Sequence, residues 1–144
     1  MAYKSGKIID GHGYVDILVS PDGKVPGQKY SALVDTGFSG FISLPIIAAT
    51  LLGLKAHTTA RYQLANGKLS EPVPLAYAFG CLDGDSFVQG LVCLSEYSSA
   101  VIGVDFLQRS GKVVFLGSKN IGIGMVDEAD LLAAVKAAKP QKKV

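Results

Sequence analysis

One stretch of the sequence decides the fold: Ala32-Leu33-Val34-Asp35-Thr36-Gly37-Phe38-Ser39-Gly40-Phe41-Ile42-Ser43-Leu44-Pro45. An apolar run leads to a single acid, which a Thr-Gly turn and a second apolar run follow. Aspartate is unfavourable in strands, and burying its charge is costly unless the charge is paired or hydrogen-bonded. Asp35 is therefore either an ordinary turn residue or the chemical centre of the protein. We favour the second interpretation because of the elements that surround it.

Length and composition predict one β-rich domain. The chain has 144 residues, of which 49% are apolar, and this is enough to fill one core. Its 17 glycines and 6 prolines separate short apolar runs, which is typical of strands joined by turns. The net charge of +2 is too small to indicate a nucleic-acid partner. No long apolar span or leader indicates a membrane, so we expect a cytoplasmic protein.

The two cysteines are predicted to be free. A hairpin that turns near residues 83–85 places Cys81 opposite Phe87, while Cys93 lies well along the partner strand. That separation is too large for a disulfide, so we expect two buried thiols. Two Cys and two His without ligand spacing also predict that there is no metal site, and nothing in the sequence calls for a cofactor.

Two predicted strands, Tyr14–Val19 and Gln28–Val34, lead to Asp35. A Ser-Pro-Asp-Gly turn between them supports a hairpin, because proline presets φ and glycine accepts a positive φ. After the Asp-Thr-Gly turn, the pattern predicts a short strand over Phe41–Leu44 and a helix over Ile46–Leu54. The acid is therefore expected to stand between two strands of one sheet.

Two further hairpins are predicted. The first has arms Thr58–Leu64 and Lys68–Phe79 around Ala65-Asn66-Gly67, and Asn-Gly is among the strongest short hairpin signals. The second turns at the Asp-Gly-Asp of residues 83–85.

The remaining sequence predicts a strand over Ala100–Gly103, a helix over Val104–Gln108 and a strand over Lys112–Leu116. Asp127 is expected to cap a last helix over Glu128–Lys139, ahead of a solvated basic tail. The apolar stripe of that helix is Leu131, Leu132 and Val135.

This series of features resembles the retropepsin-like aspartic proteases, the half-size relatives of pepsin that act as homodimers. Asp-Thr-Gly follows a strand pair and precedes a strand and a helix, and a hairpin comes about thirty residues later. Val101-Ile102-Gly103 then leads into a short helix. The resemblance covers about residues 14 to 116, and Asp35-Thr36-Gly37-Phe38 is similar to the Asp-Thr-Gly-Phe motif of the prokaryotic group.

The resemblance implies a mainly β fold, a retropepsin-like acid-protease half-barrel in a single domain with a flap hairpin and short helices. This protease domain would span residues 1–126, and residues 127–144 would add a C-terminal helix and basic tail. The implied function is an aspartic endopeptidase that works as a homodimer on a peptide or protein substrate. Each protomer contains one Asp-Thr-Gly, so a second copy must supply the other carboxyl of the reactive pair.

The resemblance assigns the catalytic positions to Asp35, Thr36 and Gly37. Two carboxyls held about 3 Å apart share one proton and can activate water. Thr36 would form a hydrogen bond across the dimer axis, and Gly37 would allow backbone N–H groups to approach the carboxylate. Gly103 would be structural, packed beneath the catalytic loop where a side chain would clash.

The resemblance also assigns the substrate-binding positions. The flap tip, Ala65-Asn66-Gly67, would close over an extended peptide, and Phe38 and Ser39 would contact it. Two alternatives stay open. Asn66-Gly67 could be a structural hairpin without gating, and Phe38 could line a pocket or fill the core.

A second function of another class is a non-catalytic, dimeric peptide-binding or assembly module on the same fold. Its motivation is Phe38, because viral and pepsin-like members usually have Ala or Ser immediately after the motif's glycine.

Overall fold

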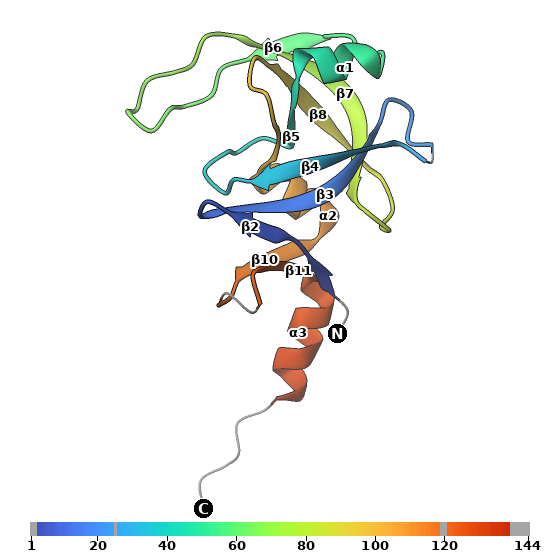
Figure 1. Ribbon diagram of the computed structural model, residues 1–144, viewed down its shortest axis with the longest axis vertical. Helices are drawn as coiled ribbons and strands as arrows, with labels where there is room; N and C mark the ends of the chain where they lie inside the picture. Colours follow the sequence, from blue (N-terminus) through green and yellow to red (C-terminus); the bar gives the residue numbers. More distant parts are fainter. Residues whose placement is uncertain (1–2, 25, 119–120, 139–144) are drawn as a thin grey trace, which may run out of the picture.

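The computed structural model describes residues 3–24, 26–118 and 121–138 of the chain (Figure 1). The elements in chain order are β1 (Tyr3–Ser5), β2 (Lys7–Ile9), β3 (His12–Ser20), β4 (Gln28–Val34), β5 (Ile42–Pro45), α1 (Ile46–Leu51), β6 (Thr58–Ala60), β7 (Val73–Leu82), β8 (Val88–Ser95), β9 (Ala100–Ile102), α2 (Val104–Ser110), β10 (Lys112–Leu116), β11 (Ile123–Asp127) and α3 (Glu128–Ala137). The protein is thus mainly β with short helices, as the sequence predicts.

Six strands close into a barrel. The pairings run β3–β4–β9–β5–β8–β7 and return to β3, where Ile17 pairs with Leu82. The β4–β9 and β5–β8 pairs are parallel, and the others in this ring are antiparallel. Strands β2 and β6 extend the sheet outward from β3 and β7. Because β4 and β9 run side by side in the same direction, the end of β4 lies beside the start of α2.

The barrel interior holds the core. On β3, the alternate residues Val15, Ile17 and Val19 are buried, as expected for a strand with one face on a core. The rings of Phe41, which directly precedes β5, and Phe106 of α2 meet at a centroid distance of 5.5 Å. Cys81 and Cys93 are both buried and free, which confirms the predicted pair of thiols.

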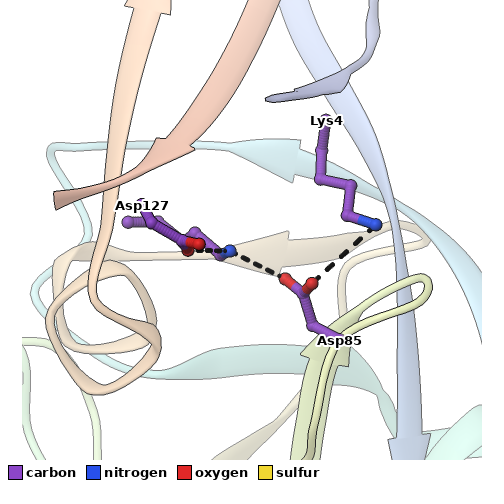
Figure 2. Close-up of polar contacts among 4 residues, drawn as sticks. Lys4, Asp85 and Asp127 are labelled. Atoms are coloured by element: carbon purple, nitrogen blue, oxygen red, sulfur yellow. Dashed lines mark hydrogen bonds and ion pairs between the residues drawn. The ribbon is translucent and has the colours of Figure 1, made fainter. Parts of the chain in front are cut away.

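A second sheet has the order β1–β11–β10 and lies at the end of the barrel that carries both described chain ends (Figure 1). Ion pairs connect it to the turn between β7 and β8. Asp85 of that turn lies 2.9 Å from Lys112 Nζ and 3.8 Å from Lys4 Nζ, and Lys112 also bonds to Asp127. Figure 2 shows Lys4, Asp85 and Asp127 converging at this junction.

Two predicted helices differ in detail from the prediction. Helix α1 ends at Leu51 rather than Leu54, because Gly53 takes φ +77° and its N–H bonds to the Thr50 carbonyl. Asp127 stands at the N-cap of α3, but its carboxylate makes no cap bond and binds Lys112 instead.

Two of the three residues in the predicted apolar stripe of α3 face solvent, and only Leu131 is half-buried. Leu132 and Val135 are 52% and 62% exposed, and no residue of α3 is buried. The helix projects from the body of the protein (Figure 1). Its predicted end, Lys139, lies outside the described residues. Within the described residues, none of the helices has both the length and the apolar character that crossing a bilayer requires.

Candidate active site

Asp35 is the first residue after β4, and its carboxylate is exposed. Its backbone N–H bonds to the Ile102 carbonyl at 3.0 Å, which continues the β4–β9 pairing by one residue. The chain then turns, with the Phe38 N–H on the Asp35 carbonyl at 3.1 Å and the Gly37 N–H on Asp35 Oδ1 at 2.9 Å. The backbone around the acid therefore orients it toward solvent at the barrel edge.

Glycine at position 37 has a steric reason. A Cβ built there would lie 3.1 Å from Asp35 Oδ1, closer than a comfortable van der Waals contact. The absence of a side chain lets the Gly37 N–H approach the carboxylate and donate a charge-assisted hydrogen bond. The resemblance implied this close approach of backbone to carboxylate, and the catalytic role of Gly37 stays a prediction.

Gly103 lies directly beneath the Asp35 loop. A Cβ at Gly103 would overlap the carbonyl oxygens of both Phe38 and Gly40. The first turn of α2 instead donates to these oxygens, from Val104 N to Phe38 O at 2.9 Å and from Asp105 N to Gly40 O at 3.2 Å. The N–H groups at the start of α2, which have no partner within the helix, thus hold the Asp35 loop. This close approach requires glycine at position 103.

A cavity of about 360 Å³ opens beside Asp35. The residues that line it include the predicted Asp35, Gly37, Phe38, Ser39 and Ala65. Among the described residues of this lining, Asp35 is the only acid. The other described lining residues carry apolar, hydroxyl, amide or thiol side chains, and include Ser43, Tyr62, Gln63, Leu64, Ser70, Val73, Cys93, Ser95, Tyr97 and Val101. A cavity whose surface is mostly apolar, with hydroxyl groups spaced along it, suits an organic ligand better than an ion.

The predicted hairpin contributes Tyr62, Leu64 and Ser70 to the wall of this cavity, among other residues. Its tip is held by the Leu64 N–H on the Lys68 carbonyl at 2.7 Å and by the Gly67 N–H on the Leu64 carbonyl at 2.9 Å. Gly67 has φ +82°, which glycine adopts without strain, so the Asn-Gly signal predicted this turn correctly. The tip residues 65–67 are exposed.

Tyr62 attaches the base of the hairpin to the barrel. Its hydroxyl shares a 2.9 Å hydrogen bond with the sulfur of Cys93 on β8. Its ring meets the Phe38 ring edge to face at 5.5 Å. Burial raises the pKa of the Tyr62 hydroxyl, and the bond to Cys93 raises it further. Burial also raises the pKa of the Cys93 thiol, so both groups stay protonated at neutral pH.

The sequence prediction missed Tyr62 and Cys93. They are 31 positions apart, and only the closure of the barrel brings them together. Conversely, Phe38 is half-buried and lines the cavity instead of filling the core. The predicted Thr36, Asn66, Gly67 and Gly103 are not in the cavity wall. Thr36, Asn66 and Gly67 are exposed outside it, and Gly103 lies under the loop.

The described residues include no group of three or more His, Cys, Asp or Glu side chains placed to hold a metal ion.

No protein-family model matches the chain, and no curated protein matches it either. Among solved structures, it is similar to a retropepsin-like aspartic protease from Rickettsia conorii, with a TM-score of 0.55 and 24% identity over 86% of this chain and 88% of that one. Simian foamy virus protease has a TM-score of 0.47 and 17% identity over 66% of this chain and 91% of its own. EIAV protease in complex with an inhibitor has a TM-score of 0.44 and 17% identity over 69% of this chain and 88% of its own. The likeness to the rickettsial structure confirms the predicted retropepsin-like fold.

Proposed function

We propose, starting from the retropepsin-like fold of this chain, that it is an aspartic endopeptidase that works as a homodimer. One observation carries the proposal. Asp35 is an exposed carboxylate on a glycine turn, at the mouth of a cavity of about 360 Å³ that contains no other acid among its described lining residues. Because hydrolysis by carboxyl groups needs one to accept a proton and another to donate one, the chain supplies half of the reactive centre.

In the dimer, the Asp35 carboxyls of the two copies would meet at a two-fold axis and share one proton. The ionised carboxylate removes a proton from a water molecule, whose oxygen adds to the peptide carbonyl carbon. The protonated carboxyl donates its proton to the carbonyl oxygen. The resulting tetrahedral intermediate then breaks its C–N bond, and the amine leaves with a proton returned from the carboxyl pair. No covalent bond to the protein is needed.

The surroundings of Asp35 support the other proposed roles. The Gly37 N–H stabilises the ionised carboxylate, and the exposed hydroxyl of Thr36 is free to reach the partner copy. The hairpin tip Ala65-Asn66-Gly67 would close over the substrate. A peptide would lie extended between this tip and the Asp35 loop, with Phe38 and Ser39 against its side chains.

We also propose a cytoplasmic location and no nucleic-acid partner. Two free cysteines agree with a reducing compartment, and the net charge of +2 is small for a protein that binds phosphate backbones.

Replacement of Asp35 by Asn tests the activity. Asparagine keeps the shape and the Gly37 hydrogen bond but cannot exchange the proton. We expect purified wild-type protein to cleave members of a peptide library, with pepstatin inhibiting it, and the Asp35→Asn variant to be inactive. The matched control is Asp83→Asn, an exposed acid that pairs with Lys29 outside the cavity and should leave cleavage intact.

The second candidate function is a dimeric peptide-binding or assembly module, which the Phe38–Tyr62 ring contact favours because it gives the cavity a rigid apolar wall. The same experiment separates the two functions. Peptide binding without cleavage in wild type, equal to binding by Asp35→Asn, would assign the module and reject the protease.

A further inference from the structure

Ser43 of β5 is a buried hydroxyl without a partner in the wall of the cavity beside Asp35. The residue lines that cavity and is only 8% exposed. Within the described chain, no group donates a hydrogen bond to its hydroxyl or accepts one from it. Ser20, the other buried polar residue described, bonds to Asp22 at 2.9 Å. Since most buried polar groups in proteins have a partner, an unpartnered one at a site indicates a ligand group that is still to arrive.

Strand alternation directs Ser43 away from the barrel core and toward the cavity. Its chain neighbours Ile42 and Leu44 are fully buried and belong to the core. Because successive side chains of a strand point to opposite faces, the Ser43 hydroxyl lies on the other face of the sheet. Tyr62 and Leu64 of the hairpin line the same cavity, so the hydroxyl is at its floor and the hairpin is across from it.

Two register neighbours extend this floor across three adjacent strands. Ser43 pairs with Cys93 on β8 and with Val101 on β9, and all three residues line the cavity. Val101 contributes only apolar surface. The Cys93 sulfur already shares its 2.9 Å hydrogen bond with the Tyr62 hydroxyl. Ser43 is thus the hydrogen-bonding side chain of this row that is available to a ligand.

The other serine and tyrosine hydroxyls of the lining are already bonded or belong to exposed residues. Ser70 Oγ donates to a backbone carbonyl at 2.9 Å and accepts from the Tyr62 N–H at 2.9 Å. Ser95 Oγ accepts from the Tyr97 N–H at 2.8 Å. Ser39 and Tyr97 themselves are exposed. A ligand that fills the cavity therefore meets one buried, unpartnered hydroxyl, and it meets it at the floor.

The lining also selects the shape and charge of the ligand. Phe38, Tyr62 and Tyr97 contribute aromatic rings, of which the first two are in edge-to-face contact at 5.5 Å. Such walls favour a further aromatic ring. One hydroxyl at the floor matches a ligand with one hydroxyl, since an amide brings two N–H donors and a carbonyl that would need more partners. A carboxylate would be repelled by Asp35, the acid of the lining.

We propose that Ser43 determines specificity: the cavity selects a tyrosine side chain of the peptide substrate over phenylalanine, and Ser43 Oγ forms a hydrogen bond with the tyrosine hydroxyl. This inference rests on the proposed function, because it names the substrate of the same site. Phenylalanine would fill the same space, but it would remove solvent from the Ser43 hydroxyl without giving that hydroxyl a partner. A site that hydrogen-bonds a substrate hydroxyl rejects the analogue that lacks it for this reason.

Peptides that differ only in Tyr or Phe, placed on each side of the scissile bond in turn, test the pocket. On one side we expect kcat/KM of wild type to be about 10-fold higher for the tyrosine peptide. Ser43→Ala removes one oxygen and leaves the walls in place, so this ratio should fall to about 1. The matched control is Ser31→Ala on β4, an exposed serine outside the cavity lining, which should keep the wild-type ratio.

The stability of Ser43→Ala checks the premise that the hydroxyl is unpartnered. Because the substitution breaks no hydrogen bond within the described chain, we expect a melting temperature no lower than that of wild type. A lower melting temperature would show that the hydroxyl serves the fold, and would overturn the pocket. Equal kcat/KM for the two peptides in wild type, or a ratio that Ser43→Ala leaves unchanged, would also overturn it.

Peptide binding, measured without cleavage, separates failure of the pocket from failure of the protease. Calorimetric titration of Asp35→Asn should give a Kd about 10-fold lower for the tyrosine peptide than for the phenylalanine peptide. In the Asp35→Asn, Ser43→Ala double variant the two Kd values should be equal. This pattern together with a wild type that cleaves neither peptide rejects the protease alone. Cleavage of both peptides at equal rates, with equal binding to Asp35→Asn, rejects the pocket alone.

Discussion

The Tyr62 hydroxyl and the Cys93 sulfur lie 2.9 Å apart and join the base of the hairpin to β8 on the cavity floor. The two arms of the hairpin are joined at Tyr62 by two hydrogen bonds. The Ser70 N–H donates to the Tyr62 carbonyl at 2.7 Å, and the Tyr62 N–H donates to Ser70 Oγ at 2.9 Å. In the described structure, the backbone hydrogen bonds of residues 63–69 lie within the hairpin and not between it and the barrel. Opening should therefore hinge at Tyr62.

Tyr62→Phe should loosen the hairpin while keeping the ring contact with Phe38. Loss of one partly buried hydrogen bond is expected to cost about 1 kcal/mol of unfolding free energy. Amide hydrogen exchange over residues 63–69 should become several-fold faster. Tyr77→Phe, at an exposed position on β7, is the control and should leave exchange in this segment unchanged. Equal exchange in the Tyr62→Phe variant and wild type would contradict the hinge.

Alkaline pH should destabilise the fold through the same pair. Burial raises the pKa of Cys93 above its ordinary 9.0 and that of Tyr62 above its ordinary 10.0. The folded chain therefore holds protons that the unfolded chain loses, so this stability is complete below about pH 9 and falls as the pH rises toward the folded pKa values. Urea unfolding from pH 7 to pH 11 measures the decline. In a Cys93→Ala, Tyr62→Phe double variant, the unfolding free energy should fall less steeply with pH. The same slope as in wild type would show that these two groups do not cause the decline.

Gly103→Ala should destabilise the protein more than a glycine substitution in open space. The added methyl group overlaps the Phe38 and Gly40 carbonyls, and overpacking of this kind costs about 1 to 3 kcal/mol. Gly53→Ala is the comparison, because a Cβ added at Gly53 would have no neighbouring atom within 4 Å. Only the positive φ opposes this substitution, which should lower the unfolding free energy by about 1 kcal/mol. Chemical denaturation of both variants gives the two values. A smaller loss for Gly103→Ala would show that the loop shifts without strain.

The stability of the junction between the two sheets should depend on the Asp85 carboxylate. The Lys112 side chain is only 9% exposed, and its carboxylate partners are Asp85 and Asp127. Burial alone would lower the pKa of Lys112, but hydrogen bonds to Asp127 and Asp85 outweigh it and raise that pKa. Asp85→Asn should therefore cost about 1 to 3 kcal/mol, since it leaves a buried charge with one partner fewer.

The exposed Lys29–Asp83 pair offers a matched control, because its members are 56% and 49% exposed. Asp83→Asn should leave the melting temperature unchanged within error. Equal melting temperatures for Asp85→Asn and wild type would mean that solvent replaces the lost carboxylate.

Local patterns in the sequence predicted the strands that surround Asp35. The bounds of Gln28–Val34 and Lys112–Leu116 agree with β4 and β10 at both ends, because alternation and turn residues are encoded within a few positions. The hairpin at Asn66-Gly67 was predictable for the same reason. Gly103 could be placed under the loop only through the resemblance to a known family, and the contacts with Phe38 and Gly40 now give its physical cause.

Properties that depend on closure of the barrel could not be read in this way. Tyr62 meets Cys93 and Phe38 only after β6, β7 and β8 have assembled, so nothing near Tyr62 in the sequence marks it. The stripe on α3 shows the converse limit: periodicity indicates which face is apolar, but not whether the fold provides a surface against it. Asp127 is a second example of a tertiary contact that the local sequence does not reveal. Its carboxylate binds Lys112, a stronger partner than the helix N–H groups.

The central claim is that the reactive centre needs one Asp35 from each of two copies. It is tested most directly by mixing wild-type protein with the Asp35→Asn variant in equal amounts, allowing subunits to exchange, and measuring cleavage per total chain. If both carboxyls are required, only wild-type homodimers are active, and activity should fall to about one quarter of that of undiluted wild type. A fall to about one half would show that each chain acts with its own Asp35 alone, and would contradict the account.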